Sequence, residues 1–251
     1  MIKAAIQSVL NTLGYRLTRL TSAPAPCWGL ESFFPLLMGF GFNPKHIVDI
    51  GANTGGWTRT AIKYFPHAHY TLVEPQDELK NHIQDLVDAG RQIHWINAGA
   101  SDQPGELSLQ VQHRKDASTF CRTPNSVGQI RVQMRTVNEI VASSGLPIPE
   151  MVKIDAEGFD LKVLAGASNL FGKTEVFLAE AGIVPTGMDN TASVLIQTMS
   201  DAGYRLIDIT DINRSPQYGL LWLCEFAFLL RTSHLLDSAT SYENPVLAPK
   251  S

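Results

Sequence analysis

HIVDIGANTGGW, residues 46 to 57, is the stretch of sequence that decides the fold. An apolar run from His46 to Ile50 leads directly into Gly51, and Gly55 opens an amphipathic segment. A buried strand that ends in a glycine-rich turn before a helix lets a ligand approach the backbone closely. The glycines lack the G-x-G-x-x-G spacing of dinucleotide-binding turns, and no Gly-Lys-Ser/Thr follows as in a phosphate-binding loop. The stretch therefore predicts a ligand-binding turn that is poorly matched to a pyrophosphate.

Downstream of this turn, apolar runs alternate with amphipathic segments, which is typical of a parallel sheet with helices on both faces. The expected strands cover residues 47–51, 70–74, 93–99, 151–155, 175–180, 204–209 and 220–230, and the expected helices cover residues 56–64, 76–89, 137–143, 159–170 and 191–202. Residues 105–112 and 130–136 alternate apolar and polar side chains, which predicts two inserted half-buried strands. Because the last two strands are close in sequence, we expect an antiparallel C-terminal edge. The fold class is thus α/β, with a doubly wound and mostly parallel sheet.

Composition excludes several kinds of partner and compartment. The 251 residues contain 20 Lys and Arg against 24 Asp and Glu, a formal net charge of -4, so there is no cationic field for a nucleic acid. The 3 cysteines form no CxxC pair, which argues against a disulfide framework and predicts a cytoplasmic location. No apolar run is long enough to span a bilayer, since Glu225 interrupts the longest one, Leu220 to Leu230.

The chain divides into an N-terminal helical extension over residues 1–43, a main domain over residues 44–237 and a tail over residues 238–251. Apolar residues recur every three to four positions from Ile2 to Leu20, which predicts a helix with one apolar stripe. We expect this helix to dock on its own domain or to form a homodimer with a second copy. A membrane-surface helix is less favoured, because only Lys3, Arg16 and Arg19 supply positive charge.

Two acids in the predicted strands suggest what the turn binds. Glu74 ends the strand beside the glycine turn, where a carboxylate can accept hydrogen bonds from a ribose diol. Dehydrogenases place an acid in the same way, and a solvated strand-end acid is the plain alternative. Asp49 lies inside an apolar strand and needs donors, which loop amides and a ligand ammonium would supply. Together these features suit S-adenosylmethionine, which has a ribose and an amino-acid tail but no phosphate.

The predicted cofactor-binding residues follow from this placement, with the adenine expected near residues 98–102. They are Asp49, Gly51, Ala52, Asn53, Thr54, Gly55, Glu74, Ala100, Ser101, Asp102 and Asp155.

The second informative segment is KIDAEGFD, residues 153 to 160. Its strand ends near two carboxylates, Asp155 and Glu157, which would share a face if the strand continued. Both would then lie at the carboxyl end of a central strand, next to the cofactor. The alternative for Glu157 is a structural role in capping the following helix.

These segments resemble the FkbM-type family of S-adenosylmethionine-dependent methyltransferases. The resemblance rests on IVDIGANTGGWT (47–58), VEP (73–75), NAGASDQPGELSL (97–109) and VKIDAEGFDLKVLAGA (152–167), and it runs from about Pro44 to Leu230. It implies a Rossmann-like class I methyltransferase fold with a seven-stranded sheet. It also implies methyl transfer to a hydroxyl oxygen of a sugar, a glycan, or a glycosylated or polyketide natural product.

Methyl transfer to a hydroxyl needs a general base within hydrogen-bond reach. The candidates are Asp155, which leads, Glu157, Glu180 and His113. A Mg²⁺ ion held by the three acids together with Asp102 is an alternative, but no ligand spacing requires it, so no metal is predicted. Two rival functions remain open at this point. One is a nicotinamide-dependent oxidoreductase, and the other is a non-catalytic scaffold with the same fold.

Overall fold

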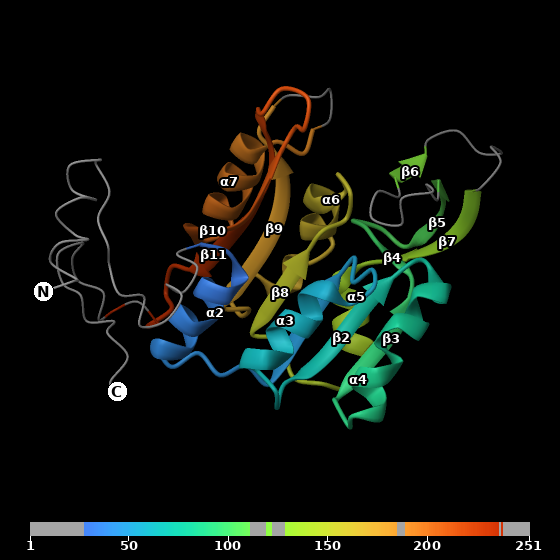
Figure 1. Cartoon of the computed structure of the whole chain (residues 1–251), viewed down its shortest axis with the longest axis horizontal. Coiled ribbons are helices and arrows are strands. Elements are labelled where there is room, and N and C mark those ends of the chain that lie inside the picture. The colour runs from blue at the N-terminus through green and yellow to red at the C-terminus, as the bar shows by residue number, and fades with distance from the viewer. Residues whose placement is uncertain (1–27, 111–118, 122–128, 185–188, 236, 238–251) are drawn as a thin grey trace, which may run out of the picture.

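The computed structural model describes residues 28–110, 119–121, 129–184, 189–235 and 237 (Figure 1). Three predicted features lie outside the described residues. They are the N-terminal helix with its proposed dimer contact, the C-terminal tail from residue 238, and the loop that contains His113.

A central sheet of seven strands forms the middle of the molecule, in the order β10-β11-β9-β8-β1-β2-β3. The strands are β1 (His46–Ile50), β2 (His69–Glu74), β3 (Ile93–Asn97), β8 (Met151–Ile154), β9 (Val176–Gly182), β10 (Tyr204–Arg214) and β11 (Leu221–Leu230). β1, β2, β3, β8 and β9 pair in parallel, whereas β11 is antiparallel to both β9 and β10. The doubly wound Rossmann-like class I methyltransferase fold with an antiparallel C-terminal edge is thereby confirmed. The last strand, β11, lies between β9 and β10, so β10 forms the outer edge of the sheet.

Helices cover both faces of this sheet, and the strand residues alternate between two apolar cores. α2 (Leu30–Gly39), α3 (Gly56–Tyr64) and η1 (Asp77–Ile83) pack with Ile47 of β1 on one face. α5 (Val137–Ser143), α6 (Asp160–Ala165) and α7 (Ala192–Asp201) pack with Val48 and Ile50 on the other. Among the described residues, no helix has the length and apolar character needed to cross a membrane.

α2 is tied to the sheet through aromatic packing. Its Phe33, Phe34 and Leu37 are completely buried. The Phe34 ring meets the Trp57 ring edge to face, with centroids 5.5 Å apart and an interplanar angle of 88°. Edge-to-face pairs of this kind add to the free energy gained from burial. α2 therefore forms part of the layer that covers one face of the sheet next to the glycine turn.

A second sheet, in the order β4-β7-β5-β6, lies beside the β3 side of the main sheet (Figure 1). It contains β4 (Gly99–Ala100), β5 (Gly105–Gln110), β6 (Thr119–Cys121) and β7 (Gln129–Arg135). β5 and β7 correspond to the two inserted strands that the alternating pattern predicts. Leu109, Val132 and Met134 form a small core of their own.

Two predicted helices are shorter than expected. Residues 76–89 form the 3-10 helix η1 followed by α4 (Gln84–Asp88), because only Leu79 and Ile83 are buried and α4 buries no residue. A longer α-helix would have little packing to stabilise it. Residues 159–170 form α6 and the short 3-10 helix η2 (Ser168–Leu170). α6 ends at Ala165, and the carbonyl oxygen of its C-cap residue Gly166 accepts the backbone N–H of Asn138 instead of continuing the helix.

Candidate functional site

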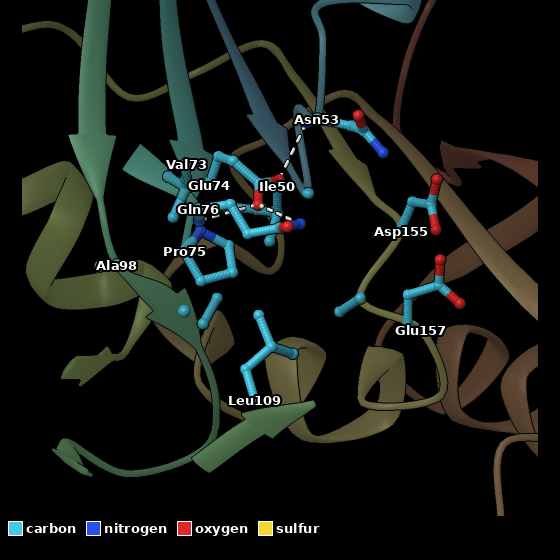
Figure 2. Close-up of a pocket in the computed structure, with 14 residues that line it drawn as sticks. Ile50, Asn53, Val73, Glu74, Pro75, Gln76, Ala98, Leu109, Asp155 and Glu157 are labelled. Atoms are coloured by element: carbon cyan, nitrogen blue, oxygen red, sulfur yellow. Dashed lines mark hydrogen bonds between the residues drawn. The ribbon is translucent and has the colours of Figure 1, made fainter. Parts of the chain in front are cut away.

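A pocket of about 190 Å³ opens at the carboxyl ends of β1, β2 and β8 (Figure 2). The strand order reverses at β1, because β2 and β3 lie on one side of it and β8 and β9 lie on the other. Ligands of doubly wound sheets bind at such a switch point. The lining residues are Ile50, Gly51, Asn53, Val73, Glu74, Pro75, Gln76, Ala98, Gly99, Ala100, Leu109, Asp155, Ala156 and Glu157.

The glycine turn at the start of this pocket is held tightly against its neighbours. The backbone N–H groups of Gly51 and Ala52 donate to the carbonyl oxygen of Val73, at 2.9 and 3.2 Å. A Cβ atom on Gly51 would lie 1.9 Å from the backbone oxygen of Asp155, and the φ angle of Gly51 is +73°. Only glycine both lacks the clashing Cβ atom and adopts this positive φ angle readily. The turn thus brings the β1 and β8 loops into direct backbone contact.

Glu74 is a buried carboxylate with a fixed position in the pocket. Its Oε2 accepts the backbone N–H of Asn53 at 2.9 Å, and its Oε1 accepts the backbone N–H of Gln76 at 3.0 Å. Burial raises the pKa of Glu74, and these hydrogen bonds oppose the shift. An ionised carboxylate has about four acceptor positions, so capacity remains for ligand hydroxyls. The arrangement suits a ribose diol.

Apolar side chains surround Glu74 and give the pocket its shape. Figure 2 shows Val73, Pro75, Ala98 and Leu109 on the Glu74 side, with Asp155 and Glu157 on the opposite side. A pocket with apolar walls and a few placed polar groups is typical of small-ligand sites. This one combines surface for a flat apolar ring with a carboxylate for a diol, which is the chemistry of a nucleoside.

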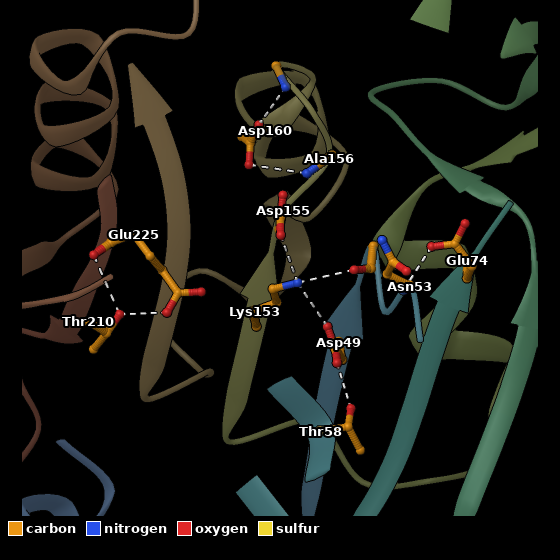
Figure 3. Close-up of polar contacts among 12 residues, drawn as sticks. Asp49, Asn53, Thr58, Glu74, Lys153, Asp155, Ala156, Asp160, Thr210 and Glu225 are labelled. Carbon is orange, nitrogen blue, oxygen red and sulfur yellow. Dashed lines mark hydrogen bonds and ion pairs between the residues drawn. The ribbon is translucent and has the colours of Figure 1, made fainter. Parts of the chain in front are cut away.

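A buried lysine connects the two motifs (Figure 3). Lys153 Nζ lies 3.3 Å from Asp49 Oδ1, 3.3 Å from Asp155 Oδ2 and 3.2 Å from the Gly51 carbonyl oxygen. Thr58 donates its hydroxyl to Asp49 Oδ2 at 2.6 Å. Burial disfavours the charged lysine, but the charges of Asp49 and Asp155 outweigh it and raise the pKa of Lys153. The ammonium therefore stays charged and fixes the position of Asp155.

A second cavity, of about 590 Å³, lies on the sheet face that α2 and α3 cover. We call it the cleft. It is lined by Trp28, Gly29, Leu30, Glu31, Gly56, Trp57, Thr60, Lys153, Asp155, Glu180, Thr210, Asp211 and Glu225. Among the described residues, Asp155 alone lines both this cleft and the pocket of Glu74. The two cavities therefore meet at Asp155.

The carboxylates near Asp155 have perturbed protonation. Burial, then the charges of Asp155, Asp160 and Glu157, raises the pKa of Glu180 to about 9. Burial and the charge of Asp155 raise the pKa of Asp160 to about 7. Asp160 accepts the side-chain amide of Asn190 at 3.0 Å, and that amide also donates to the Glu180 carbonyl oxygen at 3.0 Å. Glu180 lines the cleft, and a strongly shifted carboxyl group in a cavity is typical of functional sites.

The turn after β8 differs from the prediction in two respects. β8 ends at Ile154 and Glu157 has a φ angle of +50°, so Asp155 and Glu157 do not share a strand face, although both line the pocket. Glu157 does not cap α6 either, since the N-cap residue is Phe159 and has no side-chain cap. Asp160 instead accepts the backbone N–H groups of Ala156 and Gly158, at 3.4 and 3.2 Å.

The predicted site residues divide into those that reach a cavity and those that do not. The pocket includes Gly51, Asn53, Glu74, Ala100, Asp155 and Glu157, and the cleft includes Glu180. Neither cavity is lined by Asp49, Ala52, Thr54, Gly55, Ser101 or Asp102. Asp49 binds Lys153 and Thr58, and Asp102 is exposed and accepts the Ser101 hydroxyl at 2.8 Å. Asp102 thus does not join the other acids, and no metal-ligand cluster is found among the described residues.

Several residues of the site were not predicted from the sequence. Lys153 stands in the motif itself, in register with Asp49 on the neighbouring strand, and a cation inside a buried strand is the signal that could have found it. Glu225 interrupts an apolar run and is 7% exposed, a similar signal. No comparable sequence pattern marks Gln76, Trp28 or Trp57, because loop and helix packing brings them to the cavities.

Comparison with known proteins gives a consistent assignment. The family model of the methyltransferase FkbM domain matches residues 49–206, more than half of the chain. The hexuronic acid methyltransferase AglP of Haloferax volcanii is 24% identical over 173 residues, which are 68% of this chain and 67% of that protein.

Two solved structures are similar at low identity. Methyltransferase FkbM from Methylobacillus flagellatus KT aligns with a TM-score of 0.47 and 15% identity over 72% of this chain, which spans 43% of that one. Precorrin-6y C5,15-methyltransferase from Geobacter metallireducens GS-15 aligns with a TM-score of 0.47 and 13% identity, over 84% of this chain and 93% of that one. On the extent of the family match, the chain belongs to the FkbM methyltransferase family.

Proposed function

We propose that this protein transfers the methyl group of S-adenosylmethionine to a hydroxyl oxygen of a sugar, a glycan, or a glycosylated or polyketide natural product. The observation that carries the proposal is that Asp155 lines both the nucleoside-like pocket and the cleft. In this proposal the cleft receives the acceptor, and we call it the acceptor-side cleft from here on. A group-transfer enzyme needs its two substrates to meet at one point. The related protein AglP is named as a hexuronic acid methyltransferase, which supports a sugar as the acceptor.

The residues of the pocket fit the proposed cofactor. Glu74 would hold the ribose diol, and Val73, Pro75, Ala98 and Leu109 would enclose the adenine. No lysine or arginine lines the described part of the pocket, which fits a ligand without phosphates. When bound, S-adenosylmethionine would supply a methyl group activated by its sulfonium charge.

Asp155 is the proposed general base. An aliphatic hydroxyl must lose its proton as the new bond forms, so an acceptor oxygen in the cleft would need a carboxylate within hydrogen-bond reach. Lys153 fixes the Asp155 carboxylate at the junction through its 3.3 Å contact. Glu180, whose pKa is raised to about 9, is protonated at neutral pH and would donate a hydrogen bond to the acceptor. Glu157 lines the same pocket and would contribute to orientation.

In this proposal the catalytic domain spans residues 44–237, and the extension before it reaches the cleft through Trp28 to Glu31. Cofactor binding is tested by calorimetric titration with S-adenosylhomocysteine and, separately, with NADH. Binding of the first without the second supports the proposal, and the reverse would indicate the oxidoreductase.

The acceptor is tested with labelled methyl groups. The protein is incubated with methyl-labelled S-adenosylmethionine and with extracts of glycans and glycosylated metabolites, and the products are identified by mass. Label on a hydroxyl oxygen supports the proposal. Label on nitrogen or carbon would contradict it, and cofactor binding without label in any extract would favour the scaffold.

A further inference from the structure

A row of four carboxylates crosses the floor of the acceptor-side cleft. Glu225 of β11 pairs directly with Glu180 of β9 and with Asp211 of β10. Asp155 follows the last register pair of β8 and β9, Ile154 with Ala179, which brings it level with Glu180. All four line the cleft. Carboxyl groups directly opposite each other on neighbouring strands destabilise a sheet when they are ionised, and burying them in protonated form also has a cost. The row is therefore a cost to folding that a role in binding would explain.

Positive charge does not balance this row. Among the described residues that line the cleft, Lys153 is the only Lys or Arg. Its side chain is 4% exposed and its ammonium already contacts Asp49, Asp155 and the Gly51 carbonyl oxygen. Glu31, also in the cleft, pairs at 3.2 Å with Lys63, which does not line it. A ligand in the cleft thus meets an excess of carboxyl groups and no available cation from the described residues.

The raised pKa of Glu180 reflects a negative electrostatic potential in the cleft. After burial, the largest causes of the raised pKa of Glu180 are the charges of Asp155, Asp160 and Glu157. The same charges oppose any further anion brought next to Glu180. Hydroxyl groups of a ligand are favoured, because they can donate to the ionised carboxylates and accept from a protonated one.

Two tryptophans give the cleft apolar surface. Trp28 is 57% exposed, and the Trp57 ring is held by its edge-to-face contact with Phe34. An indole ring buries a large apolar area at a small cost in conformational entropy, because it has only two side-chain torsions. The C–H face of a sugar ring offers a matching apolar surface, and its hydroxyl groups match the carboxyl groups of the floor.

We propose that the acceptor-side cleft binds a hydroxylated ring that carries no acidic group, so that a neutral sugar is accepted and its uronic acid counterpart is rejected. This inference rests on the proposed function and narrows its substrate class. The row of four carboxylates is the proposed determinant of this specificity, and it distinguishes this chain from an enzyme that acts on an anionic sugar.

The test uses two matched pairs of probes, methyl glucoside with methyl glucuronoside and methyl galactoside with methyl galacturonoside. Binding to the full chain is measured by saturation-transfer NMR with S-adenosylhomocysteine present, and labelled-methyl transfer is measured in parallel. We expect each neutral probe to bind at least about tenfold more tightly than its acidic partner, because like charges placed together oppose binding.

A matched pair of variants tests the determinant. Asp211 is exposed, lines the cleft and accepts the backbone N–H of Ile212 at 2.8 Å. Asp208 lies on the same strand, accepts the backbone N–H of Ile209 at 2.8 Å and does not line the cleft. Asp211→Lys should lower the neutral-to-acidic ratio several-fold, and Asp208→Lys should leave it unchanged.

Equal or tighter binding of the uronosides, or no binding of any of the four probes at millimolar concentration, would overturn the inference. An equal effect of the two lysine variants would do the same. Failure of the proposed function is recognised separately, because S-adenosylhomocysteine would then not bind the unmodified protein.

Discussion

The ammonium of Lys153 lies 3.3 Å from the carboxylate of Asp155, at the point where the pocket and the cleft meet. The same ammonium contacts Asp49 of the neighbouring strand and the carbonyl oxygen of the glycine turn. One buried cation therefore joins the two sequence motifs and sets the position of the proposed base. This contact explains why two motifs about 100 residues apart can form one site.

Lys153→Met should destabilise the fold strongly. The change leaves Asp49 completely buried without its cation, and breaking a buried ion pair in this way costs about 3 to 5 kcal/mol. Adding Asp49→Asn removes the unpaired charge and should restore much of the loss. The free energy of unfolding in urea measures both effects. If Lys153→Met alone were as stable as the unmodified protein, the ion pair would not have this structural role.

Glu74→Ala should weaken S-adenosylhomocysteine binding. Loss of hydrogen bonds to a charged group typically costs 1.5 to 3 kcal/mol, which corresponds to about a 10- to 100-fold rise in Kd. Calorimetry measures the Kd, and circular dichroism checks the fold, because the backbone N–H groups of Asn53 and Gln76 lose their acceptor. The exposed Glu78 serves as the control, and Glu78→Ala should bind normally. Equal affinity of the two variants would remove Glu74 from the cofactor site.

Gly51→Ala should abolish binding of S-adenosylhomocysteine. The new methyl group would lie 1.9 Å from the Asp155 backbone oxygen, so the β1 and β8 loops would have to separate. Gly56, the first residue of α3, provides a nearby control, since a Cβ there meets no atom within 4 Å. Gly56→Ala should keep the affinity and raise the thermal stability slightly, because alanine favours a helix by about 0.5 to 1 kcal/mol over glycine. Retained binding in Gly51→Ala would contradict the close approach of the two loops.

Glu225→Gln should change how stability depends on pH. Burial raises the pKa of Glu225 from 4.5 to about 7, although Lys153 and the Thr210 hydroxyl oppose the shift. Because the folded pKa is the higher one, the contribution of this group to stability is complete below about pH 4.5 and is lost as the pH rises through about 7.

The glutamine variant has no such proton to lose, and its amide oxygen can still accept the Thr210 hydroxyl. Relative to the unmodified protein, it should gain up to about 3 kcal/mol in free energy of unfolding between about pH 5 and about pH 8. Chemical unfolding at several pH values measures the difference, with Glu78→Gln as the exposed control. A difference that does not depend on pH would contradict the raised pKa.

The sequence predicted most of the central sheet because β1, β2, β8 and β9 are buried on both faces and read as apolar runs. It also predicted α5 to the residue, and the structure shows that Thr136 and Glu139 form a capping box there, whose hydrogen bonds measure 3.1 and 3.0 Å. The single helix predicted after Glu74 is instead η1 followed by α4, because helix type and length there depend on tertiary packing, and Leu79 and Ile83 are the buried residues of this segment.

The site was predicted unevenly for similar reasons. Glu74 and Asp155 follow strands whose ends converge, so their approach to one pocket was predictable. The partner of Asp49 was not, because a buried acid signals a need for donors without naming them, and the structure supplies Lys153 and Thr58. The carboxylate row depends on strand order, in which β11 lies between β9 and β10, and no local pattern encodes that order.

The most direct test of the account is the turnover of Asp155→Asn against the acceptor found by the labelled-methyl assay, with the Kd of S-adenosylhomocysteine measured on the same preparation. Asparagine keeps the shape of the side chain, and Lys153 keeps Asp49, so cofactor affinity should be nearly unchanged. Turnover should fall by about 100- to 10,000-fold, the usual contribution of a general base. Unchanged turnover with intact cofactor binding would contradict the assignment of Asp155 as the group that meets the acceptor hydroxyl.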